Sequence, residues 1–199
     1  MFAYIKGNLE IKSNDYIVID VMGIGYKIYM SPSAIDTLGE TGQTIKVHTH
    51  YHVREDNISL YGFKTLEELR MFELLISTSG IGAKSAITIL SNITPSSFAL
   101  AIISNDTSKL VKIPGIGAKT AARIVLELKD KLKETEKLNS ETSEIKEAIV
   151  DNEKIEEAKS ALQVLGYTSK EITKVIEKMN TSGLSVEDII KNGLQLLAG

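Results

Sequence analysis

The sequence of 199 residues contains no cysteine, no tryptophan and only three prolines. Without cysteine, the chain forms no disulfide, holds no metal through thiolates and offers no cysteine nucleophile. It also lacks a run of about 18 apolar residues, and its start, MFAYIKGNLE, has no basic region followed by an apolar stretch. We therefore expect a soluble, cytoplasmic protein without a membrane span or secretory signal.

No strong excess of one charge extends over the whole chain, whose formal net charge is -3. Residues 1–64 contain six Lys or Arg and seven Asp or Glu, residues 65–134 contain nine and seven, and residues 135–199 contain eight and twelve. Only the middle part is net positive. Binding of an anionic partner is therefore favoured there, although the chain as a whole is not basic.

The hydrophobic pattern divides the chain into parts and predicts a multidomain α+β protein. In residues 1–64, short runs with the alternation of strands are separated by turn-like stretches. These runs lie at 2–6, 16–21, 25–30, 44–50 and 58–63. Five or six strands joined by hairpins predict a small antiparallel barrel. In this setting GIGYK at 23–27 is interpreted as a hairpin turn.

The rest of the chain has helical periodicity, interrupted once. Residues 65–133 carry two apolar stripes and predict a compact helical domain. Residues 134–152 are rich in Glu, Lys, Ser and Thr, and we expect a flexible linker there. Residues 153–199 predict a domain of three short helices.

Local signals in the last domain agree with one another. Gly166 and Gly183 stand where its first two helices should end. Capping-box spacing predicts the next helix starts at Thr168 with Glu171 and at Ser185 with Asp188. Leu162, Leu165 and Ile190 are expected in the core, whereas Tyr167 is expected to be a contact residue for a partner.

One motif occurs twice, as STSGIGAKSAITIL at 77–90 and KIPGIGAKTAARIV at 112–125. A glycine-rich turn that opens a helix is typical of phosphate binding, because unpaired amides point outward and the helix dipole favours an anion. GIGAKT has Ala118 where a nucleotide P-loop needs its second glycine. The dinucleotide fingerprint GxGxxG fails as well, since its sixth position is Ser85 or Thr120.

A helix, a tight GIG turn and a second helix remain, twice over, and this pattern resembles the helix-hairpin-helix motif. The resemblance implies turn amides that hold a DNA backbone phosphate, with Ile81 and Ile116 as core anchors. The candidate DNA-binding residues are Gly80, Gly82, Lys84, Gly115, Gly117, Lys119, Thr120 and Arg123. Arg123 is expected to add charge to the second copy only, because Thr88 is its counterpart in the first. The alternative is that GIG merely joins two packed helices.

Together, the barrel, the paired motifs, the linker and the tail resemble the RuvA family of Holliday-junction-binding subunits over the full chain. The resemblance is carried by VREDNISLYGF at 53–63, ISTSGIGAK at 76–84, KIPGIGAKTAARI at 112–124 and LGY at 165–167. It implies an OB-like barrel at 1–64 that mediates tetramer formation, a tandem helix-hairpin-helix domain at 65–133 and a UBA-like tail at 153–199.

The same resemblance implies how such a protein works. A homotetramer, or an octamer, would hold a four-way junction open, and the tail would bind the hexameric RuvB ATPase for branch migration in recombination and repair. A RuvC-type resolvase would belong to the wider complex. The chain itself would have no catalytic residues, no cofactor and no metal.

Glu55 and Asp56 lie between two predicted strands. A solvated charged turn is the default interpretation, and a catalytic carboxylate pair is an alternative. Two-metal nuclease chemistry would need more carboxylates than the neighbouring sequence holds. The family resemblance implies instead an acidic pin, whose charge repels the crossing phosphates at the junction centre.

His48, His50 and His52 alternate, so on a strand they share one face and form a candidate zinc site. No neighbouring carboxylate is evidently placed to complete it, and we favour a polar strand that faces another subunit or DNA. Ala118 stands where many relatives of the motif have a further lysine, which weakens the second phosphate site unless Lys112 compensates.

Two other classes of protein remain open. A nuclease subunit or repair lyase could use the same DNA grip, with Glu55 and Asp56 or a lysine for its chemistry. A general DNA-packaging protein would bind duplex and junction alike. No Ser, His and Asp constellation is discernible in the sequence.

Overall fold

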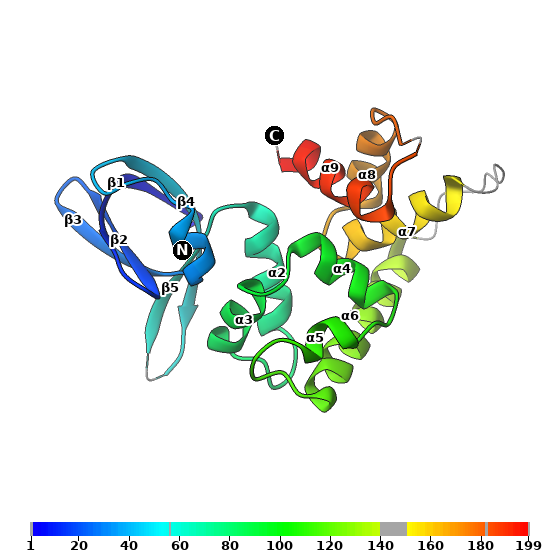
Figure 1. The fold of residues 1–199 in the computed structure, drawn as a ribbon, viewed down its shortest axis with the longest axis horizontal. Coiled ribbons are helices and arrows are strands. Elements are labelled where there is room, and N and C mark those ends of the chain that lie inside the picture. The colour runs from blue at the N-terminus through cyan, green and yellow to red at the C-terminus, as the bar shows by residue number, and fades with distance from the viewer. Residues whose placement is uncertain (1, 56, 140–150, 182, 199) are drawn as a thin grey trace.

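The computed structural model describes all residues except 1, 56, 140–150, 182 and 199, and no side chains over 131–153 or at 198. Figure 1 shows a β-barrel, followed along the chain by a helical middle part and a helical tail. The predicted α+β architecture is therefore confirmed.

The barrel is a closed sheet of five strands in the order β1-β2-β3-β5-β4. Its strands are β1 (Tyr4–Lys12), β2 (Tyr16–Val21), β3 (Ile24–Tyr29), β4 (Thr44–Val53) and β5 (Ile58–Phe63). All neighbours pair antiparallel except β3 and β5, which pair parallel and close the barrel. Alternate side chains point inward, and Leu9, Ile17, Ile19, Ile28 and Val47 are fully buried.

Two connections between the barrel strands bear on the sequence predictions: one is the turn between β2 and β3, and the other contains a short helix. Met22 and Gly23 form the turn between β2 and β3, both with positive φ, as a two-residue hairpin turn requires. The interpretation of GIGYK as a hairpin turn is thus confirmed for Gly23, whereas its other four residues belong to β3. A short helix, α1 (Pro32–Asp36), was not predicted; Ser31 caps it by accepting a hydrogen bond from the Ala34 amide.

The middle part consists of short helices around a common core. They are α2 (Leu66–Ile76), α3 (Ala83–Leu90), α4 (Pro95–Ile103), α5 (Ser108–Val111) and α6 (Ala118–Asn139). Thr65 and Glu68 form a capping box at the start of α2. The predicted stripes supply the core, with Phe72, Leu75 and Ile124 fully buried.

Aromatic packing fixes the barrel against α2. The ring of Phe72 lies 4.9 Å from that of Phe63 and 5.2 Å from that of Tyr61, measured between centroids. Contacts of this geometry add about 1 kcal/mol each to the burial of the rings. The barrel therefore positions the helical part directly.

The tail contains α7 (Asp151–Val164), α8 (Ser169–Ile176) and α9 (Val186–Ala198). Gly166 has a positive φ just after α7, as predicted. The prediction that α8 ends at Gly183 is wrong, because α8 ends at Ile176 and Glu177 is its C-cap. Thr168 and Glu171 form the predicted capping box, and Ser185 accepts a hydrogen bond from the Asp188 amide.

The tail packs against the middle part, which the sequence did not predict. Helices α7 and α9 contact α4, and the buried apolar residues of both parts form one cluster. The expectation that Tyr167 is an accessible contact residue is wrong, because its side chain is buried against Glu67 and Arg70 of α2. Leu162, Leu165 and Ile190 are buried as predicted.

The segment predicted as a linker, 134–152, is helical at both ends. Helix α6 continues to Asn139, and α7 begins at Asp151. Lys, Leu and Glu, which favour helix, account for the extension of α6. The remainder of the predicted linker, 140–150, lies outside the described residues.

Within the described parts of the chain, no single helix has both the length and the hydrophobicity needed to cross a membrane. Only α3 and α4 taken together reach both, and the pair is bent by 103°.

Candidate nucleic-acid interface

The two GIG turns have the same backbone geometry. Gly80 has a φ of +81° and Gly115 a φ of +83°, a region that side-chain-bearing residues rarely adopt. The Ile81 amide donates to the Thr78 carbonyl at 3.1 Å, and the Ile116 amide donates to the Ile113 carbonyl at 3.0 Å. The sequence repeat is therefore a structural repeat.

Each GIG turn leads into a helix whose N-cap residue is a glycine. A glycine has no side chain that could accept a hydrogen bond from the first amides of the helix. Gly82 is the N-cap of α3 and makes no side-chain hydrogen bond, and Gly117 stands in the same place before α6. A Cβ built on either glycine would have no neighbour within 4 Å. Open space in front of helix-start amides suits a large anion such as phosphate.

The side chains beside the turns divide into anchors and cations. Ile81 and Ile116 are each only 6% exposed, which fits the predicted anchoring of both turns in the core. Lys84 and Lys119 are exposed on the first turns of α3 and α6. Thr120 follows Lys119 on α6 and is half-buried.

Arg123 lies against the first turn, although it belongs to the helix of the second. Its Nη1 donates to the Ser79 carbonyl at 3.4 Å, and a Cβ built on Gly80 would lie 3.0 Å from the same nitrogen. The expectation that Arg123 adds charge to the second copy only is therefore wrong. The α6 helix passes close to the first turn, and the long guanidinium side chain spans the gap.

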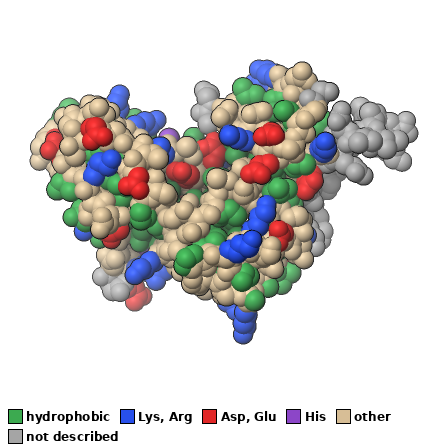
Figure 2. Space-filling view, in the orientation of Figure 1, with side chains coloured by type: hydrophobic (Ala, Val, Ile, Leu, Met, Phe, Trp, Pro, Cys, Tyr) green, Lys and Arg blue, Asp and Glu red, His purple; other side chains and the backbone are tan. Residues whose placement is uncertain are grey.

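Basic side chains lie on the same part of the molecule as these turns. Figure 2 shows Lys and Arg over the helical part and projecting from its lower end. Figure 1 shows the α2–α3 and α5–α6 connections at that end, and the tip of the β4–β5 hairpin extends to the same side. Lys112, which precedes the second turn, is also exposed.

Glu55, the first residue of the predicted acidic pair, is at the tip of this hairpin. The Arg54 amide donates to the Asn57 carbonyl at 2.9 Å and closes the loop, and the Glu55 side chain is exposed. Asp56 lies outside the described residues. Val53 and Ile58, which pair across the two strands, are 59% and 61% exposed, so the hairpin end stands clear of the barrel.

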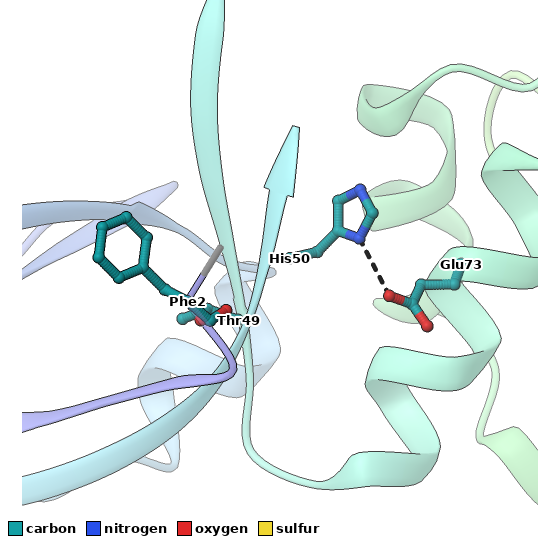
Figure 3. A network of polar contacts seen from close by, with 4 residues as sticks. All are labelled: Phe2, Thr49, His50 and Glu73. Carbon is teal, nitrogen blue, oxygen red and sulfur yellow. Dashed lines mark hydrogen bonds and ion pairs between the residues drawn. The ribbon is translucent and has the colours of Figure 1, made fainter. Parts of the chain in front are cut away.

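His50 of β4 contacts the helical part. Figure 3 shows His50 directed at Glu73 of α2, with Nδ1 and Oε1 3.1 Å apart. The His50 ring also packs on Phe72, with centroids 5.3 Å apart. The expectation that this strand faces another subunit or DNA is therefore wrong for His50, because α2 covers that face of the barrel.

The environments of the other two histidines favour neutral rings. Burial, aided by the charge of Lys46, lowers the pKa of His48. Burial also lowers the pKa of His52, aided by Arg54, whose Nε donates to His52 Nε2 at 3.0 Å. Among the described residues, no group of three or more His, Asp or Glu side chains is arranged to hold a metal ion.

Curated proteins named "Holliday junction branch migration complex subunit RuvA" are similar to this chain from end to end. The protein of Acetivibrio thermocellus is 50% identical over 200 residues, covering 100% of this chain and 99% of that protein. The protein of Ruminiclostridium cellulolyticum is 48% identical and covers 99% and 100%. That of Clostridium perfringens is 46% identical over 201 residues and covers 99% of both. The chain belongs to the RuvA family.

Family models divide the chain as a RuvA protein is divided. The RuvA N-terminal domain matches residues 1–62, the SAM-like helix-hairpin-helix tandem matches 72–130, and the RuvA C-terminal domain matches 153–198. Both GIG turns fall within the tandem. The hairpin that carries Glu55 falls within the RuvA N-terminal domain.

Two residues beside the first GIG turn, Ser79 and Glu127, were missed by the sequence analysis. The Ser79 amide donates to a carboxylate oxygen of Glu127 at 3.0 Å, 48 positions away in the chain. The only signal in the sequence is that Glu127 follows Arg123 by one helical turn, on the same face of α6. That spacing does not reveal the partner.

Proposed function

We propose that this chain is the junction-binding subunit of a branch-migration complex. It recognises Holliday junctions, holds them in an open four-way form and recruits the RuvB ATPase, in homologous recombination and DNA repair. The observation that carries the proposal is the pair of matching GIG turns, each with a lysine beside open helix-start amides. The names and full-length similarity of the relatives support it.

The turns bind the DNA backbone and not the bases. Gly80 and Gly115 shape the two turns through their positive φ. The amides that follow Gly82 and Gly117 donate to phosphate oxygens, and Lys84 and Lys119 add charge. Arg123 contributes beside the first turn and Thr120 at the start of α6. Contacts of this kind set the position of the DNA arms without selecting a sequence.

Specificity for a junction comes from symmetry and from the acidic pin. Four copies of the chain present Glu55 and Asp56 around one centre, where the crossing phosphates meet. Like charges about 4 Å apart repel by about 1 kcal/mol in water and by several times more near a protein surface. That repulsion is sufficient to favour separated arms, and it breaks no covalent bond.

In the proposed assembly, each part of the chain has its own binding role. Residues 1–64 form the tetramer, with an octamer as a second form on DNA, and residues 65–133 bind the arms. Residues 153–199, joined through 134–152, bind the RuvB hexamer, and a RuvC-type resolvase joins the wider complex. The chain acts in the cytoplasm without catalytic residues or a cofactor of its own; ATP hydrolysis belongs to the motor.

Competition between DNA substrates tests this function. Labelled four-way junction is bound at fixed salt and displaced with unlabelled junction or with duplex of equal length. Junction should compete far better than duplex, and the bound DNA should remain uncut when magnesium is added. Equal competition would favour a packaging protein, and cleavage would favour a nuclease subunit.

A further inference from the structure

Ser79, the residue before Gly80, is held through both of its main-chain polar groups. Its amide donates to Glu127 at 3.0 Å, and its carbonyl accepts from Arg123 at 3.4 Å. Both partners lie on α6, which begins at the second GIG turn. The helix of the second hairpin therefore holds the turn of the first.

Comparison of the two copies of the repeat shows why only the first turn needs hydrogen bonds from α6. The residue equivalent to Ser79 in the second copy is Pro114, whose ring fixes φ and which has no amide hydrogen to donate. The residues equivalent to Arg123 and Glu127 in the first copy are Thr88 and Asn92. The second turn is stiffened by its own proline, and the first is stiffened from outside.

The charge of Glu127 indicates a role other than direct contact with DNA. A carboxylate close to a phosphate site weakens binding, because like charges repel and each backbone contact depends on net positive charge. A hydrogen bond from an amide to a carboxylate is, in contrast, among the stronger ones. The geometry therefore favours a structural bond to Ser79.

We propose that Glu127 and Arg123 are positioning residues that fix the first phosphate site at a set distance from the second. The inference rests on the proposed function and extends it: the two sites act as one rigid, bivalent grip on a DNA backbone. When two sites are rigidly linked, binding at one raises the effective concentration at the other. Arg123 keeps its remaining guanidinium hydrogens for the DNA.

Paired substitutions of Glu127 in the full-length chain separate position from charge. Glu127→Gln removes the charge but keeps an oxygen that accepts from Ser79, and Glu127→Ala removes both. In fluorescence anisotropy with labelled junction, Glu127→Gln should bind as tightly as the wild type or more tightly. Glu127→Ala should bind about tenfold more weakly, the loss expected for one hydrogen bond to a charged group. Equal tightening by both variants would overturn the proposal.

A proline at position 79 supplies an independent test. Ser79→Pro copies the second turn, so the first turn should keep its shape without the bond to Glu127. In this background Glu127→Ala should cost less than about twofold in affinity, against about tenfold alone. If the double variant binds as weakly as Glu127→Ala, the bond does not act by fixing the turn. Thermal unfolding of each variant shows whether the fold is retained.

Coupling to Lys84 distinguishes a positioning role from a general loss of stability. Lys84→Ala should weaken binding less in the Glu127→Ala background than in the wild type, because an unheld turn no longer presents its lysine. An unchanged cost would overturn the proposal. The same coupling is expected on duplex DNA, so it can persist even if the wild type shows no preference for junctions and the proposed function fails.

Discussion

The phenol of Tyr167 donates a hydrogen bond of 3.2 Å to the carboxylate of Glu67, 100 positions earlier in the chain. Both side chains are buried, and the guanidinium of Arg70 lies 3.9 Å from the centre of the Tyr167 ring. The bond joins the tail to α2 of the helical part. Polar groups in such surroundings are costly to leave without a partner.

Tyr167→Phe should therefore destabilise the protein at neutral pH, by about 2 kcal/mol, because the Glu67 carboxylate loses a buried donor. Chemical denaturation compares the variant with the wild type. Tyr4→Phe is the control, since Tyr4 is 53% exposed. An equal effect of the two substitutions would contradict this prediction.

The same bond predicts a loss of stability at alkaline pH. Burial, and next the charge of Glu67, raise the pKa of Tyr167 from 10.0 to about 12. The folded state thus favours the neutral phenol, and its contribution is complete below the unfolded pKa and is lost as pH rises toward the folded one. The stability difference between wild type and Tyr167→Phe should shrink between pH 10 and about 12. A stability difference that stays constant over that pH range would contradict this prediction.

Acidification should weaken the fold through the histidines of β4. The pKa of His52 and that of His48 are both lowered, chiefly by burial, so the folded state favours neutral rings. Their contribution is present above the unfolded pKa of about 6.5 and is lost as the pH falls. His48→Gln with His52→Gln should reduce the loss of stability between about pH 7.5 and 5.5, measured by urea denaturation. An unaltered pH dependence would show that other groups govern it.

The salt dependence of junction binding tests Lys84 and Lys119. In the proposed tetramer, two contacts per copy give about eight contacts in all, so log K against log salt should have a slope of about -7. Replacing both lysines with alanine should flatten that slope. Lys178→Ala, exposed on the tail, is the matched control and should leave it unchanged. An unchanged slope in the double variant would remove the two lysines from the site.

Neutralising the proposed acidic pin should reduce the preference for junction over duplex DNA. Glu55→Gln with Asp56→Asn removes the repulsion of phosphates, so duplex binding should strengthen by about fivefold, equivalent to about 1 kcal/mol. Gel mobility assays with junction and with duplex give the ratio of the two affinities. Glu40→Gln, an exposed acid elsewhere on the barrel, is the control. If the ratio stays intact in the double variant, the pin assignment is wrong.

Features decided by neighbouring residues were predictable from the sequence. The glycine at the end of α7, the capping box of Thr168 and Glu171, and the left-handed Gly80 and Gly115 each depend on local backbone geometry. The barrel strands followed from alternation over a few residues. These signals are visible without knowledge of the rest of the fold.

Features decided by distant partners were not predictable. The burial of Tyr167 depends on α2, and the direction of Arg123 depends on how closely α6 passes the first turn. His50 likewise has its partner, Glu73, on another element. No spacing rule identifies such pairs, because the contact is formed by the packing of whole elements.

The sheet of this chain closes on itself in the order β1-β2-β3-β5-β4. A sheet without an open edge offers no place for a strand from a second molecule. The association of copies proposed above is therefore expected to use side chains, which single substitutions can alter while the strands remain paired. Assembly can then change in evolution, or by design, independently of folding.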